Sequence, residues 1–126
     1  MPKTILVVDD AVFMRRLLRD LFADAGYQVH EAVSGRDAIE KYTEVSPDLV
    51  TMDLGMPGMS GLDAIERIRA DDARARIVVV SAAASDAVVD RAMALGASAY
   101  VRKPFQPTTV LDTVRKALLV PRIPRC

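Results

Sequence analysis

Five polar side chains lie at the ends of apolar runs that predict β-strands. They are Asp9 and Asp10 after residues 4–8, Asp53 after residues 49–52, Ser81 after residues 77–80, and Lys103 just beyond residues 99–101. Asp53 is the most prominent of them, because Gly55 and Pro57 follow at once and the backbone must leave the sheet there, exposing the carboxylate. The set offers three carboxylates, one hydroxyl and one ammonium.

Gathered in one site, these groups favour a divalent cation. Carboxylates a few ångströms apart repel by several kcal/mol at an effective dielectric of ~20, and a cation is the simplest way to stabilise them in ionised form. Ligands that are all oxygens point to Mg²⁺. Zn²⁺ is disfavoured, because the one His and the one Cys, His30 and Cys126, lie elsewhere in the chain.

A carboxylate beside such a cation suits phosphoryl chemistry. The cation, the ammonium and the hydroxyl can together stabilise the three equatorial oxygens of a transferring phosphoryl group. Asp carboxylates act as nucleophiles that form aspartyl-phosphate. The residue types are therefore those of a site for phosphoryl transfer to Asp53.

Alternating strand and helix patterns predict how the five side chains meet. Strands are expected at residues 4–8, 28–32, 49–53, 77–80 and 99–101, and helices at 11–25, 35–44, 61–71, 86–95 and from 107 onward. Parallel strands need crossover connections, which are helical, so the pattern predicts an α/β fold, a doubly wound five-stranded parallel sheet with five helices. Ligands of such folds bind at the carboxyl ends of the strands, where the five polar side chains converge.

In the first predicted helix, apolar residues that recur every four positions define the face expected to be buried. The apolar residues expected to be buried are Phe13, Leu17, Leu21 and Ala25. The arginines expected on the solvated face are Arg15, Arg16 and Arg19. Gly26 is the predicted C-terminal stop.

Length and composition predict one soluble domain, residues 1–126, with residues 120–126 as a short tail. A hydrophobic content of 51% with 27% charged residues excludes disorder, and no apolar run approaches the ~20 residues of a membrane helix. Seventeen basic and seventeen acidic residues cancel, which disfavours nucleic-acid binding. The N-terminus lacks a signal-peptide pattern, and the single Cys126 cannot form an internal bridge, so a cytoplasmic protein is expected. The protein is also expected to be a monomer.

Four stretches resemble the receiver domains of response regulators. They are Val7-Val8-Asp9-Asp10, Met52-Asp53 with Met56-Pro57-Gly58-Met59-Ser60-Gly61, Ser81-Ala82, and Tyr100 with Lys103-Pro104-Phe105. The resemblance extends from Lys3 to about Leu119 and is closest to stand-alone, CheY-like chemotaxis regulators. It implies the flavodoxin-like strand order 2-1-3-4-5.

The resemblance also implies a metal and a phosphoacceptor. Asp53 is expected to take a phosphoryl group from a phosphohistidine on a sensor histidine kinase. Mg²⁺ is expected to be bound by Asp10, by Asp53 and by the backbone carbonyl of Gly55, with Asp9 acting mainly through a water.

A switch is implied by the same resemblance. Lys103 is expected to pair with the phosphoryl oxygens, and a cis peptide before Pro104 is expected to hold it there. Ser81 is expected to donate its hydroxyl to another phosphoryl oxygen and to move inward with its loop, which lets Tyr100 turn in. The surface of the fourth helix, fifth strand and fifth helix would then change shape for a partner.

The implied protein is a signalling switch that assists its own phosphorylation and dephosphorylation, and is not an enzyme acting on a separate substrate. The expected partners are a sensor histidine kinase, a flagellar or archaellar motor switch protein or its adaptor, and a phosphatase. Receivers dock their histidine donor beside the first helix, so the arginines of that helix are candidate kinase contacts. No nucleic-acid or membrane partner is expected.

Four alternatives stay open at this point. The chain can be a phosphorelay receiver, or a receiver excised from a longer transcription regulator. An Asp-nucleophile phosphatase of the haloacid-dehalogenase type would normally carry a second Asp where Gly55 stands. A flavodoxin-like cofactor binder would need a phosphate loop after the first strand, where Asp9 and Asp10 would repel FMN phosphate.

Two positions depart from many receivers. Gly55 and Ala83 are small where bulkier or polar side chains are common, and each lies two residues beyond a site residue. Because these positions flank the phosphoryl group, easy access of water and a short phosphate lifetime are expected.

Overall fold

The computed structural model describes residues 2–83 and 85–121, which form alternating strands and helices. The strands are β1 (Thr4–Val8), β2 (Gln28–Ala32), β3 (Leu49–Met52), β4 (Ile77–Ser81) and β5 (Ala99–Arg102). The helices are α1 (Val12–Asp24), α2 (Gly35–Val45), α3 (Gly61–Asp71), α4 (Asp86–Ala94) and α5 (Pro107–Leu119). The predicted elements are confirmed, with ends that differ by one residue. Residues 122–126 of the predicted tail, Cys126 included, lie outside the described residues.

All the strand pairs are parallel, in the order β2-β1-β3-β4-β5. The order 2-1-3-4-5 is therefore confirmed. The chain runs outward from β1 to β2 on one side and from β3 to β5 on the other, so the strand order reverses between β1 and β3. Such a switch point is where open α/β sheets bind their ligands.

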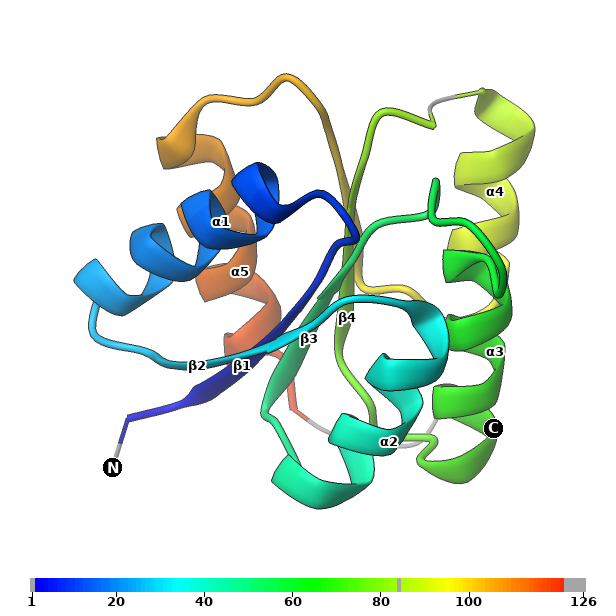
Figure 1. The fold of residues 1–126 in the computed structure, drawn as a ribbon, viewed down its shortest axis with the longest axis horizontal. Helices are drawn as coiled ribbons and strands as arrows, with labels where there is room; N and C mark the ends of the chain where they lie inside the picture. The colour runs from blue at the N-terminus through cyan, green and yellow to red at the C-terminus, as the bar shows by residue number, and fades with distance from the viewer. Residues whose placement is uncertain (1, 84, 122–126) are drawn as a thin grey trace.

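Helices cover both faces of the sheet, with α1 and α5 on one face and α2, α3 and α4 on the other (Figure 1). Phe22, Leu18 and Val110 belong to the apolar cluster under α1 and α5, and Ile65 and Ile68 belong to the cluster on the opposite face. All five residues of β4 are buried. This double coverage explains why the strands read as continuous β-branched runs and do not alternate with polar residues.

Serine side chains start three of the helices. Ser34, Ser60 and Ser85 each accept a hydrogen bond from a backbone N–H three residues further on, at 3.0, 3.2 and 3.3 Å. Gly26, the predicted stop of α1, has a φ of +99°. None of the helices in the described ranges has the length and apolar content needed to cross a membrane.

The buried face predicted for α1 is wrong at Phe13 and Leu17, although Leu21 of the same set is partly buried against the core. Phe13 is 79% exposed and Leu17 43% exposed, whereas Leu18, Phe22 and Arg15 are buried. Both apolar sets repeat every four residues, one starting at residue 13 and the other at residue 14, so the period alone could not choose between them. The sheet and α5 select the second set, and Arg15, predicted on the solvated face, is carried inward with it.

Candidate functional site

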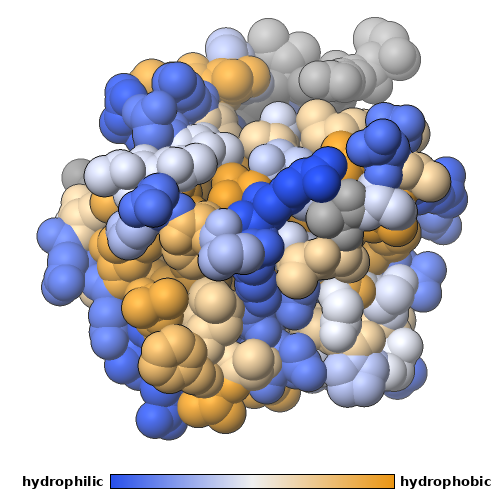
Figure 2. Space-filling view, turned by 90° about the horizontal axis from the view of Figure 1, so that it is seen from above, coloured by the Kyte–Doolittle hydropathy of each residue, from blue (hydrophilic) through white to orange (hydrophobic). Residues whose placement is uncertain are grey.

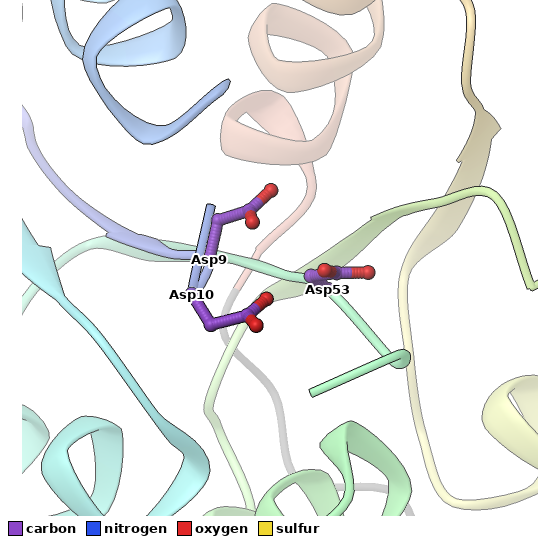
Figure 3. Close-up of side chains that lie close together, drawn as sticks. All are labelled: Asp9, Asp10 and Asp53. Carbon is purple, nitrogen blue, oxygen red and sulfur yellow. The ribbon is translucent and has the colours of Figure 1, made fainter. Parts of the chain in front are cut away.

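The switch point brings the acidic residues together. Asp9 and Asp10 follow β1, and Asp53 follows β3, the strand hydrogen-bonded to β1 in the register Val8↔Met52. The Asp53 backbone N–H continues the ladder by donating to the Val8 carbonyl at 3.1 Å. Figure 3 shows the carboxyl groups of Asp9 and Asp10 extending toward the side on which Asp53 lies.

Carboxylate oxygens of Asp9, Asp10 and Asp53 lie within 4.8 Å of one another. Asp10 is exposed, and its side chain makes no hydrogen bond or ion pair with any other residue in the ranges 2–83 and 85–121. A hard cation that binds oxygen ligands fits this donor set, because it would neutralise the clustered charge and still leave positions open to solvent. The three acids proposed from the sequence therefore do form one cluster.

Asp9 is the most enclosed acid of the cluster, with 1% of its surface exposed. Its carboxylate lies 2.7 Å from Lys103 Nζ and accepts from the Ala11 N–H at 2.9 Å. Burial raises the pKa of Asp9 above its ordinary value, and the bond from Lys103 opposes that rise without cancelling it. Burial therefore makes the ionised form of Asp9 less stable than it would be in water, and a nearby cation would reduce this penalty.

Only 8% of the surface of Asp53 is exposed, and three neighbouring groups can orient its carboxylate. Ser81 Oγ donates to Asp53 Oδ1 at 2.9 Å, and the Gly55 N–H donates to the same oxygen at 3.2 Å. Lys103 Nζ lies 3.6 Å from the other oxygen, Oδ2. One ammonium therefore stands between Asp9 and Asp53, nearer to Asp9.

Ser81 and Tyr100 are linked through the loop after β4. Ser81 Oγ accepts from the Leu54 N–H at 3.3 Å and from the Ala83 N–H at 3.1 Å, which ties the loops after β3 and β4 together. The Tyr100 hydroxyl donates to the Ala83 carbonyl. Burial raises the pKa of Tyr100, and the side chain is partly buried at the edge of the core. The structure therefore already has Tyr100 turned toward the site, the orientation that the resemblance led us to expect after phosphorylation. The peptide bond between Lys103 and Pro104 is cis, as predicted.

Two residues near the site were missed by pattern reading. Gly61, the first residue of α3, packs so closely under the acid that a Cβ added there would lie 2.2 Å from the Asp53 carbonyl oxygen. Arg15 donates to the Asp9 carbonyl at 3.0 Å. A glycine at a helix start, in the loop that follows Asp53, was the available signal for Gly61. No local signal distinguished Arg15 from its neighbours Arg16 and Arg19.

An apolar surface borders the acidic cluster on the side of α1. Val12, Phe13 and Leu17 are exposed by 52%, 79% and 43%, and with Arg16 and Asp20 they line a shallow hollow. Figure 2, which looks down on the molecule as drawn in Figure 1, shows hydrophilic residues across the middle and hydrophobic residues gathered on the side where α1 lies. Solvent-exposed apolar residues gathered beside a polar site are typical of a protein-docking surface.

Comparisons with known proteins agree with this geometry. Residues 5–115 match the response regulator receiver domain family. The chain is 49% identical over 117 residues to the chemotaxis protein CheY of Thermotoga maritima, covering 92% of this chain and 98% of that protein. It is 45% identical over 119 residues to CheY of Bacillus subtilis, covering 94% and 99%.

A solved structure matches the fold along nearly its whole length. The crystal structure of the CheX-CheY-BeF3-Mg+2 complex from Borrelia burgdorferi aligns with a TM-score of 0.91 at 30% identity, covering 95% of this chain and 92% of that chain. With strand order, acidic cluster and relatives in agreement, the protein belongs to the response regulator receiver domain family of two-component signalling, and within that family it is CheY-like.

Proposed function

We propose that this receiver is a phosphorylation-dependent switch in chemotaxis, and that Asp53 accepts its phosphoryl group from a phosphohistidine on a sensor histidine kinase. The observation that carries the proposal is the setting of Asp53, a nearly buried carboxylate flanked by two more acids and by Lys103 and Ser81. An Asp53 carboxylate oxygen bonds to phosphorus as the P–N bond breaks, and the imidazole leaves with the electron pair and takes up a proton. Identities of 49% and 45% to CheY proteins favour chemotaxis over a phosphorelay or an excised receiver.

Mg²⁺ is the cation that the acidic cluster fits. Asp10 and Asp53 would hold it directly, together with the Gly55 carbonyl, and Asp9 would act through a water. Bound there, the ion supplies charge neutralisation for the phosphoryl oxygens. Two observations support this assignment: the Asp10 carboxylate is exposed and free to act as a ligand, and burial raises the pKa of Asp9, a penalty on its ionised form that a nearby cation would reduce.

Lys103 and Ser81 would bind the phosphoryl group once it is attached. Lys103 Nζ already lies 3.6 Å from Asp53 Oδ2, so a phosphoryl group on Asp53 brings acceptor oxygens within its reach. Ser81 would exchange its bond to Asp53 Oδ1 for a phosphoryl oxygen. The loop that carries Ser81 also carries Ala83, whose carbonyl accepts from Tyr100. Movement of Ser81 is therefore communicated to Tyr100 and the surface of α4, β5 and α5, where the output partner would bind.

The exposed apolar residues of α1 would dock the kinase. Val12, Phe13 and Leu17 stand on the helix that begins directly after the acidic pair, so a protein seated on them would bring its histidine close to Asp53. We expect Phe13→Ala to slow phosphotransfer from the phosphorylated kinase domain, while the rate with a small-molecule phosphodonor is unchanged. Val33→Ala, at an apolar position with 51% exposure in the segment between β2 and α2, is the matched control. Equal kinase rates for both variants would exclude this docking surface.

The proposed phosphoacceptor is tested with acetyl phosphate and mass spectrometry. The wild-type protein should gain one phosphoryl group in a Mg²⁺-dependent manner, and Asp53→Asn should gain none. Asp24→Asn, which changes an exposed acid at the end of α1, should behave as the wild type does. Phosphorylation of Asp53→Asn at the wild-type rate would refute the proposal.

A second experiment separates the possible outputs. Partners are captured from lysate with the protein in the presence and absence of beryllofluoride and Mg²⁺. Enrichment of a motor switch protein or its adaptor by beryllofluoride supports the chemotaxis assignment. Enrichment of a histidine phosphotransfer protein in their place would favour the phosphorelay.

A further inference from the structure

Arg15 is a buried cation next to the acidic cluster, with no part in the phosphoryl chemistry described above. It lies in the first turn of α1 and is 8% exposed. Its Nη1 donates to the Asp9 carbonyl at 3.0 Å, and its Nε donates to Glu31 Oε1 at 3.0 Å on the neighbouring strand β2. A single planar guanidinium therefore joins α1, the end of β1 and β2.

The Asp9 carbonyl belongs to the peptide unit that links Asp9 to Asp10. A peptide unit is rigid and planar, so the direction of its carbonyl also determines the position of the Asp10 Cα. The other side of Asp9 is held as well, since its N–H donates to the Ala32 carbonyl at 3.2 Å. Asp10 has no side-chain partner within the described part of the chain, so its placement is set by the backbone on either side of it, where the Ala11 N–H also donates to the Asp9 carboxylate at 2.9 Å.

We propose that Arg15 is a positioning residue for the cation site: by holding the Asp9 carbonyl it aims the Asp10 carboxylate into the acidic cluster. The inference rests on the proposed Mg²⁺ site. A free guanidinium so near a divalent cation would repel it, but the ion pair with Glu31 offsets the positive charge. Arg15 therefore acts through the geometry of the backbone and not through its charge.

The test is a Mg²⁺ titration followed through backbone amide signals in ¹H–¹⁵N NMR spectra of the full chain. We expect Arg15→Met to weaken Mg²⁺ binding by about tenfold, the lower end of the range for residues that orient metal ligands. At saturating Mg²⁺, phosphorylation of this variant by acetyl phosphate should return to nearly the wild-type rate. Arg36→Met removes an exposed arginine in the first turn of α2 that makes no ion pair within the described residues, and it should bind Mg²⁺ normally.

Further variants separate positioning from general stability. Val114→Ala removes buried methyl groups from α5, far along the chain from the acidic pair, and should lower stability without changing Mg²⁺ affinity. Arg15→Lys keeps the charge and one donor, so its affinity should lie between the wild type and Arg15→Met. If Arg15→Met does not fold, Arg15→Lys decides the question, and an unchanged Mg²⁺ affinity in that variant overturns the inference.

Two other results would also overturn it. One is wild-type Mg²⁺ affinity in Arg15→Met, and the other is a loss of affinity in Val114→Ala equal to that in Arg15→Met. Asp10→Asn distinguishes a failure of this inference from a failure of the proposed function. If Asp10→Asn weakens Mg²⁺ binding and Arg15→Met does not, only the role of Arg15 is wrong, whereas unchanged affinity in Asp10→Asn places the cation elsewhere.

Discussion

Gly61→Ala should damage both the stability of the domain and the phosphoacceptor. A Cβ at this position would lie 2.2 Å from the Asp53 carbonyl oxygen, 2.7 Å from the Leu54 Cα and 2.9 Å from the Asp53 carbonyl carbon. All three are backbone atoms, so no side chain can turn away to make room. Relief requires α3 and the end of β3 to move apart by about 1 Å, and overpacking of this kind costs about 3 kcal/mol. For a domain of this length that corresponds to a fall of roughly 10 °C in Tm.

Gly55→Ala is the matched control in the same loop. Its added Cβ would meet Asp53 Oδ1 at 3.9 Å, an ordinary contact, so stability should change by less than about 0.5 kcal/mol. Urea unfolding gives the free energy of unfolding of both variants, and acetyl phosphate with Mg²⁺ gives their phosphorylation rates. Gly61→Ala should lose most of its phosphorylation because the displaced backbone carries Asp53 with it. If Gly61→Ala lowers the free energy of unfolding by less than about 1 kcal/mol, as Gly55→Ala is expected to do, the steric reasoning is refuted.

Three other predictions concern the core, the buried acid and the phosphate lifetime. Thr51 Oγ1 is buried without a hydrogen-bond partner among the described residues, so Thr51→Val, which keeps the shape and removes the hydroxyl, should raise the unfolding free energy by about 1 kcal/mol in urea titrations. A loss of stability would mean that the hydroxyl is bonded. Because burial raises the folded-state pKa of Asp9, the folded protein holds this proton more tightly than the unfolded chain. This tighter proton binding stabilises the folded protein fully below the unfolded-state pKa of about 4. The stabilisation is lost as pH rises through the folded-state pKa. Asp9→Asn should therefore gain stability relative to the wild type as pH rises toward 7 without Mg²⁺, and a difference independent of pH would contradict the shift. Gly55→Met places a side chain beside Asp53 Oδ1 and should lengthen the phosphate half-life several-fold, as followed by ³¹P NMR. A wild-type phosphate that persists for many hours with Mg²⁺ would contradict the expected access of water.

The strands were predictable because their cause is local. Buried parallel strands require continuous apolar, β-branched residues, and runs such as Ile77–Val80 meet that requirement without reference to the rest of the chain. The starts of α2, α3 and α4 were predictable for the same reason, since a serine caps each of them through a bond to a residue only three positions away. The order of the strands came from the resemblance, because a pattern of periods does not say which strands pair.

The wrongly predicted buried face of α1 shows the limit of prediction from local sequence patterns. Two apolar sets, one containing Phe13 and Leu17 and the other Leu18 and Phe22, satisfy the same helical period. Only packing against the sheet and α5 decides between them, and Phe13 and Leu17 of the rejected set become part of the exposed surface. The same packing decision buries Arg15, whose partners Asp9 and Glu31 lie six and sixteen residues away along the chain.

By itself, the sequence determined the strands, the helices and the residues that end each strand, because hydrophobic period, capping and turn chemistry act over a few residues. Its motifs also identified the acids, the serine and the lysine that a receiver requires. Only the tertiary structure decided which of these groups contact one another. The 2.7 Å contact between Lys103 and Asp9 joins residues 94 positions apart, and the bond between Ser81 and Asp53 joins residues 28 apart. Such contacts depend on strand order and on which face each helix buries, and both are properties of the folded domain as a whole.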